Sequence, residues 1–222
     1  MPVSAGKRAV VLLSGGLDSL VAAALTRDEA ELVLAITCDY GQRAAAREVE
    51  AARRQAQWLG CPHEVVALSW LGALGGSALT DAAQALPEPA PGQLDAPEIT
   101  TETARAVWVP NRNGVLVNVA AAYAERLGAE WVVCGFNVEE AATFPDNSRA
   151  FMQAADALWA FSTATHVRLH SPTADLDKRQ IVRRGRALGA PLELVWSCYR
   201  GGEQQCGRCE SCRRLTRAME TQ

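Results

Sequence analysis

Short apolar runs and longer Ala-rich, charged stretches alternate along the first 190 residues. The apolar runs have strand length, and their predicted strands are Arg8–Leu13, Glu31–Cys38, Glu64–Leu68, Trp131–Phe136 and Val167–His170. The stretches between them predict the helices Asp18–Arg27, Arg43–Leu59, Gly114–Leu127, Ser148–Ser162 and Asp177–Leu188. Strands separated by helices of this length are typical of βαβ units. We therefore expect an α/β fold with an open parallel sheet and helices on both faces.

The alternation fails between Ser69 and Ala106, where prolines and glycines are frequent. A long irregular segment in a compact domain is either a tolerated surface insertion or a functional element such as a lid or a partner-binding segment. We expect residues 1–190 to form one domain that includes the irregular segment 69–106. Residues 191–222 would then form a small C-terminal extension.

Composition excludes bulk disorder, because 49% of the residues are hydrophobic and 21% are charged. No apolar run approaches the length of a membrane span or of a signal-peptide core, so we expect a soluble, cytoplasmic chain without membrane contact. The net charge of −3 is unevenly distributed. Residues 1–177 hold 12 basic and 21 acidic groups, whereas residues 178–222 hold 10 basic and 4 acidic groups. The basic tail leaves nucleic-acid contact open.

The segment Ser14–Ser19 reads Ser-Gly-Gly-Leu-Asp-Ser, directly after the first strand and at the start of a helix. Two glycines permit a tight turn, and a helix N-terminus offers free N–H groups to an anion. A plain capped turn is the alternative. The loop lacks the dinucleotide fingerprint and the Walker motif, and the chain has only two lysines, Lys7 and Lys178. The hexapeptide resembles the pyrophosphate loop of N-type ATP pyrophosphatases, which implies that Asp18 is associated with Mg²⁺ and ATP.

Four cysteines near the C-terminus have the short spacing of a structural zinc site. The predicted ligands are Cys198, Cys206, Cys209 and Cys212. Neighbouring arginines, at positions 200, 208, 213 and 214, would offset the charge of four thiolates. An iron–sulfur cluster or a redox disulfide remains an alternative. The other three cysteines, at positions 38, 61 and 134, are expected to be small buried hydrophobic residues.

Three weaker polar clusters follow predicted strands or precede a helix, where open α/β sheets bind ligands. Their candidate phosphate- or substrate-contacting residues are Tyr40, Gln42, Arg112, Asn113, Asn137, Glu139 and Asp146. Arg112 can pair with a phosphate or a carboxylate through its guanidinium fork, although it is also compatible with an exposed turn. Glu139, Glu140 and Asp146 can hydrogen-bond a nitrogen-rich ring, although helix capping by Asp146 or Asn147 is an equal competitor.

Taken together, four segments resemble the family of 7-cyano-7-deazaguanine synthases across nearly the whole chain. They are the Ser14–Ser19 loop, Val109–Asn113, Phe144–Asp146 and the tail from Trp196 through the cysteine cluster. The resemblance implies a fold like that of adenine nucleotide alpha hydrolases. It also implies an ATP-dependent carbon–nitrogen ligase of queuosine biosynthesis, which converts 7-carboxy-7-deazaguanine, free ammonia and ATP into the 7-cyano product. Structural zinc, Mg²⁺ with ATP and a homodimer without direct nucleic-acid contact are implied as well.

The resemblance assigns ATP binding to one continuous stretch after the first strand. Its residues are Leu13, Ser14, Gly15, Gly16, Leu17, Asp18, Ser19, Leu20, Val21, Ala22 and Ala23. Leu20 and the segment Phe144–Ser148 depart from the family pattern, so contacts to the purine are not transferred. Two other readings remain open: a tRNA-modifying enzyme of the thiolation or lysidine type, and a non-catalytic zinc module that binds nucleic acid.

Overall fold

The computed structural model describes residues 6–220 and contains one five-stranded sheet in which all paired strands are parallel. The strand order is β3-β2-β1-β4-β5. The strands are β1 (Lys7–Leu12), β2 (Ala30–Asp39), β3 (His63–Ala67), β4 (Trp131–Val133) and β5 (Arg168–His170). This arrangement confirms the expected open parallel sheet.

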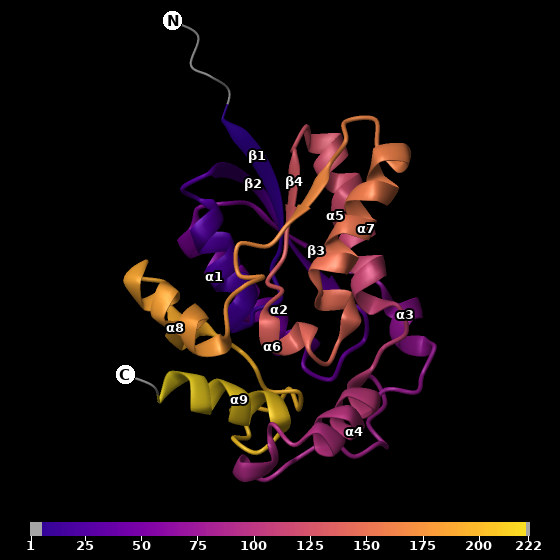
Figure 1. Cartoon of the computed structure of the whole chain (residues 1–222), viewed down its shortest axis with the longest axis vertical. Helices are drawn as coiled ribbons and strands as arrows, with labels where there is room; N and C mark the ends of the chain where they lie inside the picture. Colours follow the sequence, from indigo (N-terminus) through magenta and orange to yellow (C-terminus); the bar gives the residue numbers. More distant parts are fainter. Residues whose placement is uncertain (1–5, 221–222) are drawn as a thin grey trace, which may run out of the picture.

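Helices cover both faces of the sheet (Figure 1). One face carries α1 (Leu17–Thr26) and α2 (Ala45–Leu59), and the other carries α5 (Arg112–Leu127) and α7 (Arg149–Ser162). Successive side chains of β1 point to opposite faces of the sheet, as in any pleated strand. Val10 packs with the α5 and α7 side chains, whereas Val11 packs with the alanines of α1 and α2. The many alanines allow these helices to approach the sheet closely.

The predicted strand Trp131–Phe136 is too long, because β4 ends at Val133. The chain leaves the sheet to pass beside the start of α1. A Cβ atom on Gly135 would lie 2.4 Å from the backbone nitrogen of Ser19, so only glycine fits there. This close approach brings the segment after β4 against the segment after β1.

The prediction of an irregular loop over residues 69–106 is wrong in part. The structure contains α3 (Ser69–Ala73), a 3-10 turn η1 (Pro91–Gln93) and α4 (Pro97–Val107). Leucines of the segment enter the core, namely Leu71, Leu79, Leu86 and Leu94. Proline is compatible with the first position of a helix, so Pro97 begins α4 rather than preventing it.

The C-terminal part of the chain crosses beneath the sheet and packs beside this segment (Figure 1). It includes α8 (Lys178–Ala187), η3 (Leu192–Leu194) and α9 (Glu210–Met219). Two short elements, α6 (Val138–Ala141) and η2 (Pro145–Asn147), follow β4. Within residues 6–220, no helix is long and apolar enough to cross a lipid bilayer.

The strand order reverses direction at β1, because the chain moves from β1 to β2 and β3 and then returns to β4 on the other side. In open α/β sheets, ligands bind at such a switch point, outside the carboxyl ends of the strands. The segments after β1 and β4 therefore define where a site is expected, and both carry candidate residues from the sequence.

Candidate active site and metal centre

The loop Ser14–Ser19 forms a tight turn between β1 and α1. Gly15 has a φ of +80°, and a Cβ atom on it would lie 2.5 Å from the carbonyl oxygen of Glu48. The Gly15 carbonyl accepts hydrogen bonds from Gln55 Nε2 at 2.8 Å and from the Trp196 N–H at 2.9 Å. The first N–H groups of an α-helix have no partner within the helix, and in the described chain no side chain caps those of α1. This favours an anion site over a capped turn.

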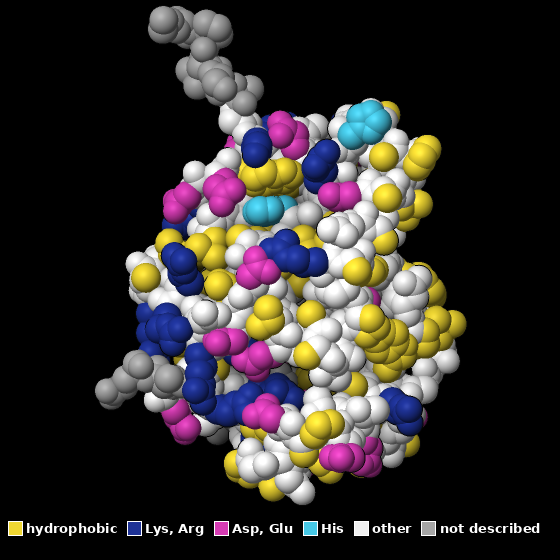
Figure 2. Space-filling model, in the orientation of Figure 1, with side chains coloured by type: hydrophobic (Ala, Val, Ile, Leu, Met, Phe, Trp, Pro, Cys, Tyr) yellow, Lys and Arg dark blue, Asp and Glu magenta, His cyan; other side chains and the backbone are white. Residues whose placement is uncertain are grey.

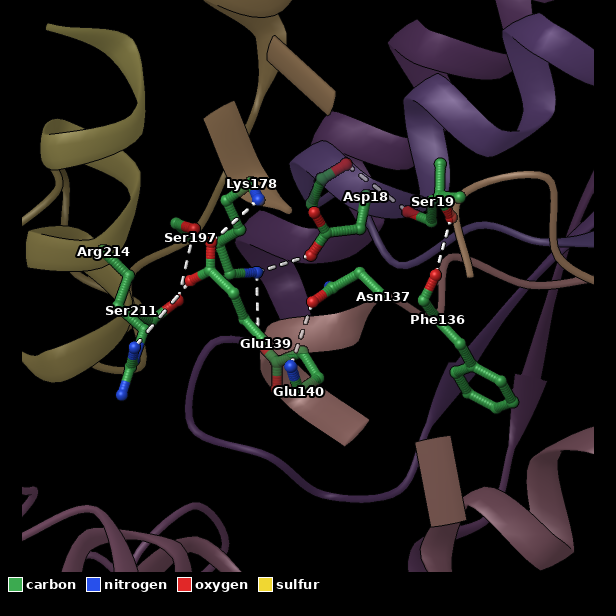
Figure 3. Close-up of polar contacts among 12 residues, drawn as sticks. Asp18, Ser19, Phe136, Asn137, Glu139, Glu140, Lys178, Ser197, Ser211 and Arg214 are labelled. Carbon is green, nitrogen blue, oxygen red and sulfur yellow. Dashed lines mark hydrogen bonds and ion pairs between the residues drawn. The ribbon is translucent and has the colours of Figure 1, made fainter. Parts of the chain in front are cut away.

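Asp18, Glu140 and Lys178 converge on the start of α1 from three elements, α1, α6 and α8 (Figure 3). The Lys178 Nζ lies 2.7 Å from Asp18 Oδ2 and 3.0 Å from Glu140 Oε1. The Lys178 side chain is only 13% exposed. The second oxygen of Asp18, Oδ1, is buried and has no hydrogen-bond partner. An unpartnered carboxylate oxygen beside an anion-binding turn is suited to a cation or a ligand donor.

The three groups perturb one another in opposite directions. Burial raises the pKa of Asp18, although the ammonium of Lys178 opposes that effect. The ammonium of Lys178 lowers the pKa of Glu140, and the more distant Arg214 contributes in the same direction. Burial lowers the pKa of Lys178, but attraction to the two carboxylates outweighs it and the pKa is raised. Lys178 thus stays charged and compensates the negative charge of both neighbours.

These groups line a cavity of about 320 Å³ at the carboxyl ends of β1, β2 and β4. Of the stretch assigned to ATP, the residues Leu13, Ser14, Gly16, Leu17, Asp18 and Ser19 line the cavity. Four others, Leu20, Val21, Ala22 and Ala23, are completely buried in α1 and face the core. Their contribution to a site is limited to the helix backbone.

Tyr40, Arg112 and Asn113 lie on another wall of the same cavity. The Arg112 guanidinium lies over the Tyr40 ring, 6.0 Å from its centroid, and its Nε donates to Asn113 Oδ1 at 3.3 Å. Burial lowers the pKa of Arg112, but Tyr40 and Asp146 outweigh that effect and hold it above its ordinary value. Burial also raises the pKa of Asp146, against the attraction of Arg112. Arg112 is half-buried and begins α5, so the alternative of an arginine in an exposed turn is wrong.

Two candidates, Gln42 and Asn137, form hydrogen bonds with neighbouring residues of the chain. Gln42 accepts from the Tyr40 N–H at 2.9 Å and donates to Glu48 Oε2 at 2.8 Å, so it braces the turn after β2. Asn137 caps α6 by accepting from the Glu140 N–H at 2.9 Å, and its buried Nδ2 has no partner. Neither Asp146 nor Asn147 caps the following helix, because the side chain of Ser148 caps α7.

Of the two neighbouring glutamates that the sequence suggested, Glu140 contacts Lys178 Nζ. Glu139 instead accepts a hydrogen bond from the backbone N–H of Lys178 at 2.9 Å. Lys178 was missed altogether. The only signal was its rarity, since it is one of two lysines and begins a predicted helix.

The four predicted ligand cysteines form one cluster. Their Sγ atoms all lie within 4.8 Å of one another, and three of the four residues are buried. Backbone N–H groups of Arg200 and Cys206 each lie 3.4 Å from the sulfur of Cys198. Four soft sulfur donors with N–H groups aimed at them fit a tetrahedral metal such as zinc. The other three cysteines are buried in the core, as predicted.

Arg200 interacts with Cys206, in line with the predicted offset of thiolate charge, but the arginines near the cluster have other partners as well. Arg200 and Arg208 pair with Glu88, and Arg213 donates to the carbonyl oxygen of Pro89. Basic and acidic side chains accordingly lie side by side over α8 and α9 (Figure 2). Much of the positive tail is thus neutralised by the chain itself.

Comparisons with known proteins agree with this geometry. A family model described as queuosine biosynthesis protein QueC matches residues 8–222. The chain is 54% identical over 214 residues to a 7-cyano-7-deazaguanine synthase from Desulforudis audaxviator. That alignment covers 96% of this chain and 97% of the relative. Identity to the enzyme of the same name from Bdellovibrio bacteriovorus is 52% over 215 residues, with coverages of 96% and 93%.

Solved structures of similar fold include the following one. It is a 4-thiouridine synthetase–RNA complex with bound ATP, at 18% identity and a TM-score of 0.53. The match covers 99% of this chain and 51% of that one. At this identity the similarity concerns the fold alone.

Proposed function

The chain belongs to the QueC family of queuosine biosynthesis proteins and is an enzyme of the ligase class, and from that premise we propose that it uses ATP to convert 7-carboxy-7-deazaguanine and ammonia into 7-cyano-7-deazaguanine. The observation that carries this proposal is the glycine turn after β1, with Asp18 Oδ1 buried and unpartnered in the adjoining cavity.

The chemistry explains why ATP is needed. A carboxylate is a poor electrophile, because its leaving group would be oxide. Attack of a carboxylate oxygen on the α-phosphorus of ATP forms an acyl adenylate and releases pyrophosphate. Ammonia then displaces AMP, giving the amide and a proton. The amide oxygen attacks the α-phosphorus of a second ATP and releases pyrophosphate, and loss of AMP and two protons leaves the nitrile.

The protein's part in this scheme is positioning and charge stabilisation. The turn at Gly15 and Gly16 and the N-terminus of α1 would hold the departing phosphates, a role supported by the close backbone approach at Gly15 and the lack of a side-chain cap on α1 in the described residues. Mg²⁺ bound with ATP would neutralise phosphate charge, and Asp18 is the residue suited to hold it. Lys178 keeps Asp18 and Glu140 fixed. Arg112, held against Tyr40, offers its fork to the substrate carboxylate or to a phosphate.

We propose zinc as the metal of the four-cysteine cluster, in a structural role. It would tie the loop at Cys198 and Cys206 to the first turn of α9, which carries Cys209 and Cys212. We also propose residues 1–190 and 191–222 as the two parts of the chain, a homodimer, a cytoplasmic location and no direct contact with nucleic acid.

The two alternative functions lack support from the site. A tRNA-thiolating enzyme needs a reactive mid-chain cysteine, yet Cys134 is 3% exposed and burial raises the pKa of its thiol to about 12. A nucleic-acid module needs available basic side chains, whereas four of the tail arginines, Arg200, Arg208, Arg214 and Arg217, pair with Glu88 or Asp95.

The proposal is tested by incubating the protein with 7-carboxy-7-deazaguanine, ammonium, Mg²⁺ and ATP and following the products by mass. We expect the amide first and then the nitrile, both dependent on ATP. Absence of both products from folded, metal-loaded protein contradicts the proposed function.

A further inference from the structure

Arg214 connects the metal-bearing helix to the ion cluster of the active site. It lies on α9, two residues after Cys212, and its side chain is only 14% exposed. The guanidinium donates to the carbonyl oxygen of Leu94 at 2.8 Å and pairs with Glu210 Oε1 at 3.0 Å. Its Nη1 also lies 4.0 Å from Glu139 Oε2 (Figure 3). One side chain thus joins α9 to the segment before α4 and to α6.

Glu139 carries this connection into the active site. One of its oxygens, Oε2, faces Arg214, and also Arg217 at 3.6 Å. The other, Oε1, accepts the backbone N–H of Lys178 at 2.9 Å. Glu140, the next residue on the same short helix, pairs with Lys178 Nζ at 3.0 Å. A shift of Glu139 therefore moves both Glu140 and the backbone of Lys178, whose Nζ contacts Asp18 Oδ2.

We infer that Arg214 is a positioning residue, which holds Glu139 and through it keeps Lys178 and Glu140 aligned with Asp18 for nucleotide activation. The inference rests on the proposed function. It also gives the metal centre a second role. A bound metal would fix the first turn of α9, and the position of that turn determines the position of Arg214.

The need for arginine follows from the number and directions of its partners. Four acceptors, on Leu94, Asp95, Glu139 and Glu210, surround one guanidinium. A planar group with five N–H donors can serve several acceptors at once, whereas an ammonium acts as a compact point charge. The pair with Glu210 is shielded from screening by salt, because both side chains are at most 14% exposed.

Arg213 provides a matched control. It is the adjacent residue on α9 and also binds the segment before α4, through the carbonyl oxygen of Pro89. Within the described residues, Glu139 pairs with Arg214 and Arg217 but forms no ion pair with Arg213. Arg213→Met therefore removes a comparable contact to that segment while leaving the connection to Glu139 intact.

The test compares steady-state kinetics of nitrile formation for the wild type, Arg214→Met, Arg213→Met, Glu139→Gln and the double variant Arg214→Met/Glu139→Gln. We expect Arg214→Met to lower kcat about tenfold, to leave KM for ATP within threefold, and to retain the metal content of the wild type. Arg213→Met should stay within twofold of the wild-type kcat. Because both residues act through one contact, the double variant should be no slower than about twofold below the slower single variant.

Each outcome decides the inference. An unchanged kcat for Arg214→Met, an equal loss for Arg213→Met, or multiplicative losses in the double variant overturns it. If Arg214→Met fails to hold its metal, Glu139→Gln decides, because that substitution lies away from the cysteines: a lowered kcat supports the inference and an unchanged kcat overturns it. A wild type that forms no nitrile overturns the proposed function together with this inference, whereas an active wild type with an unaltered Arg214→Met variant overturns the inference alone.

Discussion

The ammonium of Lys178 lies 2.7 Å from Asp18 Oδ2, although 160 residues separate the two along the chain. Asp18 stands at the start of α1 and Lys178 at the start of α8. The ion pair therefore fixes two helix N-termini beside one cavity, and it leaves Asp18 Oδ1 buried without a partner. Substitution of Asp18 is therefore the first functional test of this site.

Replacing Asp18 with Asn keeps the shape of the side chain and removes its charge. We expect nitrile formation to fall at least about 100-fold, in the range seen when one electrostatic partner of a transition state is lost. Asp175→Asn is the control, because Asp175 pairs with Arg149 on the surface and is 69% exposed. Comparable rates for the Asp18→Asn variant and the wild type contradict the assigned role.

Replacing Lys178 with Met leaves Asp18 and Glu140 close together without a counter-charge. We expect the free energy of unfolding to fall by about 2 kcal/mol, less than for a completely buried pair because the three side chains keep some exposure. Urea denaturation measures this. Lys7→Met is the control: Lys7 lies over the Trp131 ring at the surface, 4.1 Å from its centroid, so its loss should cost about 0.5–1 kcal/mol. Equal losses for the two lysines argue against a special role for the cluster.

Replacing Cys206 with Ser removes one sulfur donor from the cluster at the C-terminus. Because structural zinc contributes directly to folding, we expect loss of the bound metal and a clear drop in the melting temperature. Metal analysis and thermal unfolding check this. Cys61→Ser makes the same chemical change at a core cysteine and should retain the metal. A Cys206→Ser variant with full metal content and unchanged stability refutes a structural metal site.

Acid should loosen the segment around Glu88. A hydrogen bond from Arg200 lowers the pKa of Glu88 below its usual 4.5. A carboxylate with a lowered pKa contributes stability that is complete above its unfolded pKa and is lost as the pH falls through its folded pKa. The loss therefore begins below about pH 4.5. We expect hydrogen exchange over residues 86–95, corrected for its intrinsic pH dependence, to become faster in that range.

Glu88→Gln serves as the control for this titration. The variant should show faster exchange over residues 86–95 already at neutral pH and little further change in acid. Identical acid responses of the variant and the wild type would assign the effect to other groups.

The local features of the fold and site are readable from the sequence, and the long-range ones are not. The Ser14–Ser19 loop and the four cysteines lie within short stretches, so spacing alone identifies them. Lys178 gains its meaning only when the fold places it beside Asp18, and nothing near it in the chain indicates that. The same holds for the tail arginines, because their partners Glu88 and Asp95 lie more than 100 residues away. Helix α4 was not predicted from the sequence, because its proline and threonines are typical of loops. Thr103 and Val107 are buried by contacts with distant parts of the chain, which the local sequence does not indicate.

The most direct measurement of the central claim is the fate of the carboxylate oxygens during nitrile formation. The substrate is 7-carboxy-7-deazaguanine with ¹⁸O in both carboxylate positions, supplied with ammonium, Mg²⁺ and unlabelled ATP. Adenylation of the acid and then of the amide predicts two AMP for each nitrile, each AMP carrying one ¹⁸O. Exclusive formation of ADP, or AMP that carries no label, contradicts the account.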